Sequence, residues 1–380
     1  MAEHPRDRLR RDDPDDRDRL PRGDRDDLDD RDRLARGDRD DLDRLRHHGD
    51  AELRPGLLDL AVNVRLGAPP AWLLSRLGRS LPLLASYPDP ARAVAAVARR
   101  HDRATDDVLV TAGAAEAFVL LARALTPTYA VCVHPSFSEP EAALLAAGHR
   151  VHRQVLAPPY ILDPADVDEQ ADLVVIGNPT NPTGVVHERL AELCRPGRTV
   201  VVDEAFMDAV PGEPQSLAHR GDLPGLVVVR SLTKTWALAG LRVGYLLAPP
   251  ELVALLRDAQ PLWSVSTPAL VALETCLARG PVAAAVKDAA QTVVEREHLA
   301  QSLQSLGVEV TPGSVAPYLL CRVEGRPDVR EVLRYKGIAV RRGDTFPGLT
   351  GEHWRTAVRD RAASDRLIDA LRQTLGQGPA

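Results

Sequence analysis

The sequence predicts an α/β fold whose mostly parallel sheet is covered by helices on both faces. Five continuous runs of Val, Leu and Ile alternate with helical patterns, and such runs are typical of strands buried on both faces of a sheet. The strand-like runs are Val108–Gly113, Ala130–Phe137, Ala171–Pro179, Thr199–Ala205 and Gly225–Leu232. The helical patterns that follow the first two runs cover Ala114–Ala124 and Glu139–Ala147. With 380 residues, the chain is long enough for two or three domains and a large core.

Composition and charge argue against several classes of protein. The net charge of -6 disfavours a nucleic-acid binder held by a global positive field. No apolar run approaches the length of about 18 residues that a membrane span needs, and the N-terminus lacks the apolar core of a signal peptide. The four scattered cysteines fit free thiols in a reducing cytoplasm better than a disulfide framework or a zinc site. We therefore expect a cytoplasmic protein with no metal, no membrane and no nucleic-acid partner.

Residues 1–50 differ in composition from the rest of the chain. They hold 14 arginines and 18 acidic residues, and a charged pattern that starts at Asp15 recurs from Asp29 with one change. Almost the only apolar side chains are single leucines, which bury too little surface to offset the entropy of ordering. We therefore expect a disordered tail, with a docking tail for a partner as the alternative, and a folded part that begins near Leu57.

Polar residues follow directly after the predicted strands. Because ligands of open α/β sheets bind beyond the carboxyl ends of the strands, these residues are the first candidates for a binding site. The first two strands are followed by Gly113-Ala114-Ala115, which opens a helix whose free N–H groups suit a phosphate, and by Phe137, which suits contact with a planar ring. The third strand is followed by the amide of Asn181 in NPTNPTG, and the fourth by the carboxylate of Asp203. The fifth is followed by Lys234 and Arg242 in SLTKTWALAGLRVGY.

This combination of groups describes a pyridoxal-phosphate pocket. Asp203 would keep the pyridine nitrogen protonated, so that the ring can accept electrons, and Lys234 would carry the Schiff base. The chain has only three lysines, and Lys287 and Lys336 lie in no comparable context. Arginine could not replace Lys234, because a guanidinium does not deprotonate and form an imine.

In their order along the chain, these motifs resemble those of fold-type I pyridoxal-phosphate enzymes of the aminotransferase class I/II superfamily, over about residues 57–375. The resemblance implies a three-layer αβα large domain, a smaller α+β domain, and an enzyme that is a decarboxylase (lyase) or an aminotransferase. It assigns catalysis to Lys234 and Asp203. The cofactor-binding residues that it implies are Ala114, Ala115, Phe137, Asn181, Asp203, Phe206, Ser231, Lys234, Arg242 and, at the neighbouring subunit's cofactor, Tyr87. The substrate-binding residues that it implies are Arg355, as the clamp of the α-carboxylate, and Asn63 and Arg65 at the pocket mouth.

Within the superfamily, the chain is most similar to threonine-phosphate decarboxylases of cobalamin biosynthesis and to histidinol-phosphate aminotransferases. Phe206 stands where most aminotransferases have a tyrosine, and RRGDTFPGL from Arg341 resembles a segment of the decarboxylases. The chain departs from the usual pattern at Ser364-Asp365, where a Glu-Asn pair is common, and at Arg65, which replaces an asparagine. We expect an L-threonine O-3-phosphate decarboxylase-like enzyme that acts on an amino acid or amino-acid phosphate through an external aldimine.

Two alternatives stay open. One is an aminotransferase of the histidinol-phosphate type, or a divergent pyridoxal-phosphate enzyme with another amino-acid substrate. A carboxylate that Arg355 holds in the ring plane would favour loss of the Cα proton to Lys234, whereas a decarboxylase must loosen this clamp. The other is a non-catalytic scaffold that uses the charged tail.

We expect three regions, namely the tail 1–50, a large cofactor-binding domain at 81–260, and a small domain built from 51–80 and 261–376. The active site would lie between the domains and between subunits, so the partners expected are a small anionic amino substrate and a second copy of the chain. A phosphorylated substrate needs further cations, for which the candidates are Arg65, Arg341, Arg342 and Arg359.

Overall fold

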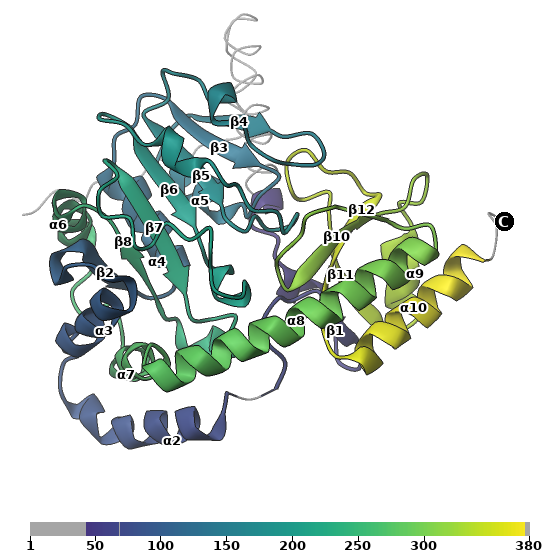
Figure 1. Cartoon of the computed structure of the whole chain (residues 1–380), viewed down its shortest axis with the longest axis horizontal. Coiled ribbons are helices and arrows are strands. Elements are labelled where there is room, and N and C mark those ends of the chain that lie inside the picture. The colour runs from purple at the N-terminus through teal and green to yellow at the C-terminus, as the bar shows by residue number, and fades with distance from the viewer. Residues whose placement is uncertain (1–42, 68, 377–380) are drawn as a thin grey trace, which may run out of the picture. The chain divides into compact units, whose positions relative to one another are not determined.

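The computed structural model describes residues 43–67 and 69–376, so the predicted tail lies outside the described residues up to position 42. From Leu45 onward the chain belongs to one compact unit, and the architecture given below is that of this unit. Figure 1 shows a large sheet with helices on both sides, a smaller sheet beside it, and the long helix α8 (Arg279–Ser305) running along both.

The large sheet has seven strands and is mostly parallel, as predicted. Its spatial order is β2-β8-β7-β6-β5-β3-β4, in which only β8 runs antiparallel to its neighbours β7 and β2. The strands are β2 (Val108–Thr111), β3 (Ala130–His134), β4 (Val151–Val155), β5 (Leu173–Gly177), β6 (Thr199–Asp203), β7 (Leu226–Ser231) and β8 (Gly244–Leu247). Because β5, β6 and β7 are parallel neighbours, the residues that follow them meet at one edge of the sheet.

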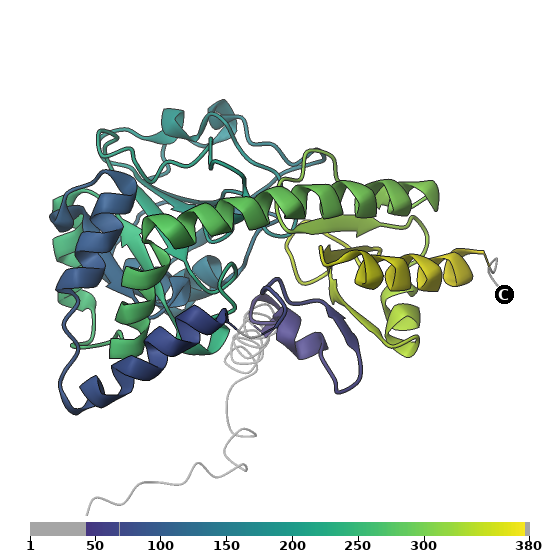
Figure 2. The same ribbon diagram turned by 60° about the horizontal axis from the view of Figure 1, so that its bottom comes forward.

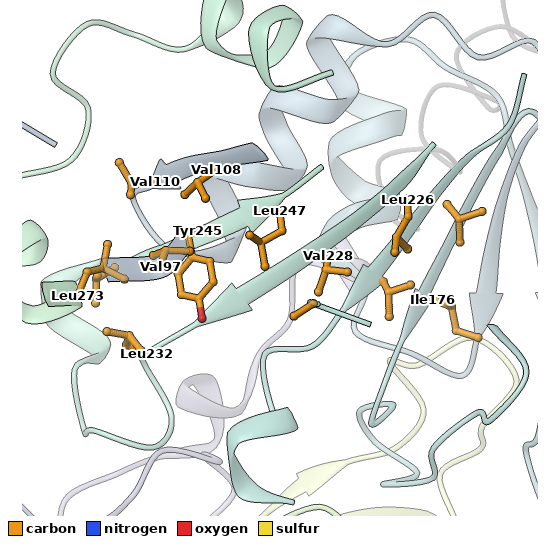
Figure 3. Packing of buried hydrophobic residues seen from close by; sticks show 14 of the residues in the cluster. Val97, Val108, Val110, Ile176, Leu226, Val228, Leu232, Tyr245, Leu247 and Leu273 are labelled. Atoms are coloured by element: carbon orange, nitrogen blue, oxygen red, sulfur yellow. The ribbon is translucent and has the colours of Figure 1, made fainter. Parts of the chain in front are cut away.

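Alternate residues of these strands pack on opposite faces of the sheet. On β6, Val200 and Val202 belong to one core cluster, whereas Val201 belongs to another. The first cluster, part of which Figure 3 draws, packs against α2 (Ala71–Ser80), α3 (Ala91–His101) and α7 (Thr267–Cys276). The second packs against α4 (Ala114–Ala124), α5 (Glu139–Ala146) and α6 (Pro250–Ala259). Burial on both faces is the physical reason for the continuous apolar runs in the sequence.

The smaller sheet has five strands in the order β1-β11-β12-β10-β9. These are β1 (Leu58–Leu60), β9 (Glu309–Val310), β10 (Tyr318–Arg322), β11 (Ile338–Arg342) and β12 (His353–Ala357). Their core cluster includes Leu299 of α8, Leu333 of α9 (Val329–Tyr335) and Leu367 of α10 (Arg361–Leu375). Arg341 of β11 and Arg355 of β12 are direct cross-strand partners, which brings two cations together in the smaller sheet.

Short 3-10 helices connect the larger elements. They are η2 (Gly49–Glu52), η3 (Leu81–Ala85), η4 (Thr105–Asp107), η5 (Pro164–Asp166), η6 (Leu190–Leu193), η7 (Met207–Ala209) and η8 (Ala239–Leu241). Among the described residues, no single helix is long and apolar enough to cross a membrane, although the bent pair α7 and α8 passes by length and composition alone. Within the same residues, no group of three or more His, Cys, Asp or Glu side chains is placed to hold a metal ion.

The packing of two segments differs from the predicted boundaries. The described chain is already packed at Leu45, which is 1% exposed and whose carbonyl accepts a hydrogen bond from Ser138 Oγ, so the folded part begins well before Leu57. Helices α2 and α7, which we expected in the small domain, contribute Leu73 and Leu270 to the first core cluster of the large sheet. This packing favours a domain boundary near the start of α8. The sequence also gave no sign of β4, whose side chains are largely exposed, or of the antiparallel β8.

Candidate active site

A cavity of about 500 Å³ lies where β5, β6 and β7 end. Residues from both sheets line it, together with residues that precede β1. Every predicted site residue except Arg65 and Tyr87 is among them: Asn63, Ala114, Ala115, Phe137, Asn181, Asp203, Phe206, Ser231, Lys234, Arg242 and Arg355. The structure therefore brings together side chains that are up to 292 positions apart in the sequence, from Asn63 to Arg355.

One end of the cavity is built to bind an anion. Gly113 caps helix α4 with φ +80°, and a Cβ atom at this position would lie 2.7 Å from Arg242 Nη2. Only glycine fits both the backbone and this approach. The Arg242 guanidinium consequently lies beside the first turn of α4, where the backbone N–H groups of Ala114 and Ala115 have no intrahelical acceptor. A cation, a helix N-terminus and the nearby Ser231 hydroxyl together suit a phosphate group.

Lys234 and Asp203 lie in the middle of the cavity wall. Burial, helped by the positive charges of Arg355 and Arg242, lowers the pKa of Lys234 to about 8, while the Asp203 charge opposes this shift. Burial raises the pKa of Asp203 to about 6, against the opposing effects of the Ala205 N–H and of Lys234. The lysine is therefore far easier to deprotonate than an exposed lysine. The Asp203 carboxylate accepts a hydrogen bond from Ala205 N at 3.0 Å and would be stabilised by a cationic partner.

Arg355 is held rigidly in the wall. It is 4% exposed, and it donates to Asn181 Oδ1 at 2.5 Å and to the Ala61 carbonyl. With the Asn63 amide turned to satisfy its hydrogen bonds, its oxygen accepts from Arg355 Nη1 at 3.1 Å and from Nε at 3.2 Å. Burial, followed by the charge of Arg341, lowers the pKa of Arg355 to about 9. An anion beside this guanidinium would relieve the cost of burying it.

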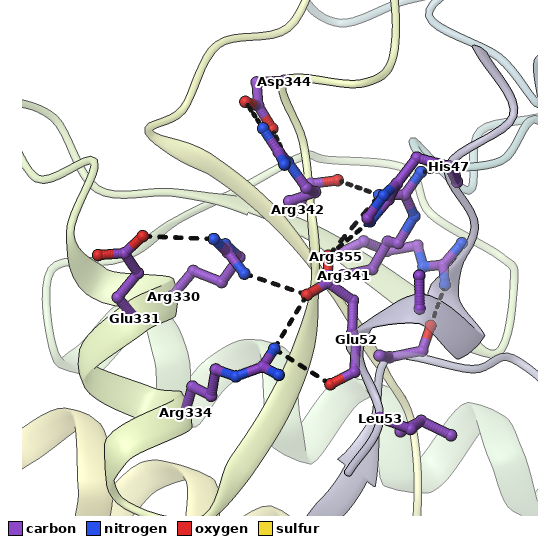
Figure 4. Close-up of polar contacts among 12 residues, drawn as sticks. His47, Glu52, Leu53, Arg330, Glu331, Arg334, Arg341, Arg342, Asp344 and Arg355 are labelled. Carbon is purple, nitrogen blue, oxygen red and sulfur yellow. Dashed lines mark hydrogen bonds and ion pairs between the residues drawn. The ribbon is translucent and has the colours of Figure 1, made fainter. Parts of the chain in front are cut away.

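Arg341 supplies a second buried cation beside Arg355. It is 3% exposed and lines the same cavity, and Figure 4 shows the two side chains close together. Its guanidinium donates to the carbonyls of Arg342, at 3.2 Å, and His47, and its Cζ lies 4.8 Å from the centroid of the Phe346 ring. Burial lowers the pKa of Arg341 to about 10, against the opposing charge of Glu52. Two arginines that face each other across adjacent strands repel, so this arrangement favours an anionic ligand between or beside them.

Two aromatic side chains border the same space. Phe206, which is 7% exposed, packs edge-on against Tyr318 with ring centroids 4.9 Å apart, and Lys234 Nζ lies 5.8 Å from its centroid. Phe137 lines the cavity near the end of β3. The Phe206 position therefore offers an apolar surface but no hydroxyl group to the cavity.

Three predicted cation positions differ from expectation. Arg65 lines a second cavity of about 500 Å³, which also contacts Lys234, and its guanidinium pairs with Asp288 of α8 at 2.6 Å. Arg359 uses its donors on the carbonyls of Asp59, Val62 and Val64, so it holds the segment before α2 and has little capacity left for a substrate. Arg342 pairs with Asp344.

Tyr87 lies outside the cavity. It is 74% exposed and stacks on Trp263 with ring centroids 4.1 Å apart and an interplanar angle of 19°. It reaches no other predicted site residue within the chain. A role at the cofactor of a neighbouring subunit stays a prediction.

Residues that precede β1 also line the cavity, and they were not predicted from the sequence. His48 and Asp50 both line it, as does Glu139 at the start of α5. The His48 ring lies 5.4 Å from the Phe137 ring, and its Nε2 is 2.6 Å from Glu139 Oε1. The only sign of these residues in the sequence was the change from the charged repeat to His47-His48-Gly49, and the prediction assigned that segment to the tail.

The residues present fit pyridoxal phosphate. The close approach of Arg242 to Gly113 forms an anion cradle, and the buried Asp203 carboxylate is matched to a cationic ring nitrogen. The lowered pKa of Lys234 suits an amine that must act as a nucleophile.

Comparisons with known proteins agree with this geometry. The model of the family "Aminotransferase class I and II" matches residues 56–371. A histidinol-phosphate aminotransferase of Mycobacterium tuberculosis is 52% identical over 319 residues, which are 83% of this chain and 87% of that protein. The threonine-phosphate decarboxylase of Salmonella typhimurium is 32% identical over 348 residues, which cover 85% of this chain and 93% of that protein.

A solved structure has the same fold. The crystal structure of the histidinol-phosphate aminotransferase from Clostridium acetobutylicum superposes with a TM-score of 0.77 at 24% identity, covering 84% of this chain and 99% of that one. The higher sequence identity to an aminotransferase than to the decarboxylase favours the alternative reading of the sequence over the decarboxylase that we first expected. The chain belongs to the aminotransferase class I and II family, whose members are enzymes that use pyridoxal 5'-phosphate.

Proposed function

We propose that this chain is an aminotransferase for an amino substrate that carries a phosphate group, of the histidinol-phosphate type. The observation that carries the proposal is the pair of buried arginines, Arg341 and Arg355, that line the cavity from adjacent strands. Neither guanidinium has a carboxylate within normal hydrogen-bonding distance among the described residues, since Glu52 Oε1 is 3.9 Å from Arg341 Nη1. Their charge would be matched by an anionic substrate. The 52% identity to a histidinol-phosphate aminotransferase supports the same choice.

The cofactor would be held by residues at the ends of β2, β3, β5, β6 and β7, and by Arg242 in the loop before β8. Ser231, Arg242 and the N–H groups of Ala114 and Ala115 would bind its phosphate, Asn181 its ring hydroxyl, and Asp203 its ring nitrogen, with Phe137 and Phe206 flanking the ring. When bound, pyridoxal phosphate supplies an aldehyde for imine exchange and a ring that accepts electrons from the substrate Cα. Asp203 would hold a proton at the ring nitrogen, because that proton neutralises a buried carboxylate.

The anchoring of Arg355 favours transamination over decarboxylation. Its guanidinium is fixed by Asn181 Oδ1 and the Ala61 carbonyl, so it would hold a substrate anion in one orientation. A decarboxylase needs its carboxylate to turn out of the ring plane, which a fixed clamp opposes. Lys234 Nζ, with a pKa of about 8, would then take the Cα proton as a general base.

The substrate assignment is tested by comparing two phosphorylated amines. Purified protein loaded with pyridoxal phosphate should form amino-acid product from a 2-oxo acid and L-histidinol phosphate, and should release no CO2 from O-phospho-L-threonine. Arg341→Gln should raise the KM for L-histidinol phosphate by about 10- to 100-fold, as expected for the loss of charge-assisted hydrogen bonds. Arg342→Gln is the matched control, because its guanidinium pairs with Asp344 instead.

Decarboxylation is the second candidate, and Phe206 is the observation that favours it. The family resemblance implies a tyrosine at this position in most aminotransferases, and here Phe206 lines the cavity. Release of CO2 from O-phospho-L-threonine without any keto product would replace our proposal with this one.

We also propose that the protein forms a homodimer through the surface around Tyr87 and Trp263. The stacked pair is exposed, and apolar side chains that are each more than half exposed flank it: Leu81, Leu83, Leu84 and Leu262. A contiguous exposed apolar surface of this kind is typical of a protein interface. This surface would place Tyr87 at the second subunit, as the family resemblance implies.

The dimer proposal predicts that Leu262→Asp combined with Trp263→Asp gives a monomer with lost or much reduced activity. Light scattering coupled to gel filtration measures the mass, and circular dichroism checks the fold. Tyr335→Asp is the control, because Tyr335 is 93% exposed but lies on α9. A double variant that remains a dimer would show that the interface lies elsewhere.

A further inference from the structure

The residues 45–52, here called the strap, precede β1, and His48, Gly49 and Asp50 within them line the cavity. On the large-domain side, the Leu45 carbonyl accepts from Ser138 Oγ, and His48 Nε2 lies 2.6 Å from Glu139 Oε1. On the small-domain side, the strap ends in η2, where Glu52 meets α9 and β11. The strap is therefore attached to both sides of the active site.

Glu52 is the main anchor of the strap. Its carboxylate is 3% exposed and lies 3.0 Å from Arg330 Nη1, 3.5 Å from Arg334 Nη1 and 3.1 Å from His47 Nε2. Figure 4 shows these side chains converging on it from α9 and the strap itself. A buried carboxylate with several cationic partners cannot leave without exposing unpaired charges, so it fixes the position of η2.

Gly49 fixes the strap against the substrate-binding wall. A Cβ atom at this position would lie 2.5 Å from the Ala61 carbonyl oxygen, so only glycine allows the observed contact. The same carbonyl accepts the hydrogen bond from Arg355. The next residue of the strap, Asp50, is thereby held at a defined place relative to the arginine clamp.

Asp50 contributes a negative charge to the cavity. It lines the cavity, and within residues 43–67 and 69–376 no side chain pairs with its carboxylate. Burial lowers the pKa of both Lys234 and Arg341, and the charge of Asp50 opposes this lowering at each of them, so Asp50 lies within electrostatic range of the reacting amine and of the Arg341 guanidinium. The cavity thus contains the two arginines, Arg341 and Arg355, together with the solvent-exposed Asp50 carboxylate.

We propose that Asp50 is a specificity-determining residue that binds a positively charged end group of the substrate, while Arg341 and Arg355 bind its anionic group. The inference rests on the proposed function and narrows its substrate class to phosphorylated amines that also carry a cationic nitrogen, such as an imidazolium. O-Phosphothreonine has no such group beyond its reacting amine and would leave the Asp50 carboxylate unmatched. An unmatched charge lowers affinity for the wrong ligand, which is how a single carboxylate produces selectivity.

The test uses two unreactive phosphate esters of the same shape, 3-(imidazol-4-yl)propyl phosphate and 3-(pyrazol-4-yl)propyl phosphate. Both lack the amino group, so binding to the pyridoxal-phosphate-loaded enzyme is measured by calorimetry without any reaction. At pH 6, below the ordinary imidazole pKa of about 6.5, only the imidazole ester is cationic. The wild-type enzyme should bind it about tenfold more tightly, as expected for one charge-assisted contact at a solvent-accessible site.

Asp50→Asn should abolish this preference and leave the affinity for the pyrazole ester unchanged. Glu331→Gln is the matched control and should keep the wild-type preference, because Glu331 contacts Arg330 from the exposed side of the same cluster. Equal binding of both esters by the wild-type enzyme, or a preference that survives Asp50→Asn, would overturn the role of Asp50 and leave the aminotransferase proposal standing. If neither ester binds, the paired-arginine anion site is wrong, and the inference fails with the proposed function.

Discussion

Replacing Lys234 by alanine is expected to lower kcat by about 10⁴-fold or more, because in the proposed function this one side chain supplies both the imine nitrogen and the general base. Lys234→Arg should be equally inactive, although it keeps the positive charge, since a guanidinium neither deprotonates nor forms an imine. The matched controls are Lys287→Ala and Lys336→Ala, which remove the other two lysines of the chain and should leave kcat unchanged. Steady-state kinetics with L-histidinol phosphate and a 2-oxo acid measures the effect. Substantial activity in Lys234→Ala would contradict the assignment of the base.

The lowered pKa of Lys234 adds a pH dependence that does not require turnover. The neutral amine is the form that attacks an aldehyde, and the pKa of about 8 means that this form accumulates as the pH rises through 8. The rate at which cofactor-free protein captures pyridoxal phosphate should therefore rise with a midpoint near pH 8 and level off at higher pH. Arg355→Gln removes the second-largest cause of the lowered pKa, so the midpoint should move to higher pH. Absorbance after rapid mixing measures the rate, and a midpoint near 10.5 in the wild-type protein would show that the cavity does not shift this amine.

The centre of the candidate site could be predicted because local sequence determines it. Asn181, Asp203 and Ser231 each end or follow a strand that is buried on both faces, and parallel strands bring their ends to one edge. Helix α4 spans Ala114–Ala124, as its pattern predicted, and its cap at Gly113 is a backbone requirement that glycine alone satisfies. At these positions, the residues that form the buried strand or the helix cap lie within a few positions of the candidate cofactor-binding residues.

The strap could not be predicted because distant residues determine its position. Glu52 is fixed by Arg330 and Arg334, which lie 278 and 282 positions later, and no apolar periodicity marks the segment that contains His48 and Asp50. Its composition continues that of the charged repeat, so the sequence favoured a tail up to residue 50. Only its tertiary contacts show that the strap is packed.

Arginine roles were equally difficult to predict from sequence. By sequence, Arg65, Arg341 and Arg359 are all candidates to bind a substrate anion. The N–H groups of an arginine can, however, also donate their hydrogen bonds to carboxylates or to backbone carbonyls of the protein. Arg65 pairs with Asp288 and Arg359 donates to three carbonyls, whereas Arg341 faces the cavity. Whether an arginine binds an acceptor within the protein or faces the cavity depends on the atoms directly around its guanidinium. Neither residue type nor sequence spacing specifies those atoms.

Arg230 is the residue whose removal should cost most stability. It is 2% exposed on β7, and its guanidinium lies 2.9 Å from Glu204 Oε2 and 2.8 Å from Glu213 Oε2 and also bonds Asp208. All three carboxylates belong to the segment that follows Asp203, which also carries Phe206. Arg230→Met would leave them without their cation in a buried site, and we expect the free energy of unfolding to fall by about 3–5 kcal/mol. Arg230→Lys should lose less, because an ammonium keeps the charge but cannot reach all three partners.

The pH dependence of this loss distinguishes buried charge from lost packing. Burial already raises the pKa of Glu204 and of Asp208, with Arg230 opposing both shifts, so removing the arginine should raise them further. A carboxyl whose pKa is higher in the folded state binds its proton more tightly there, so the folded state gains stability as the pH falls through that pKa. The deficit of Arg230→Met relative to the wild-type protein should therefore be largest near pH 8 and smaller near pH 5, as measured by urea unfolding. Arg220→Met, which removes an exposed partner of Asp222, should show no measurable deficit at either pH. A deficit in Arg230→Met that is the same at both pH values would mean that packing, and not charge, is the role of this residue.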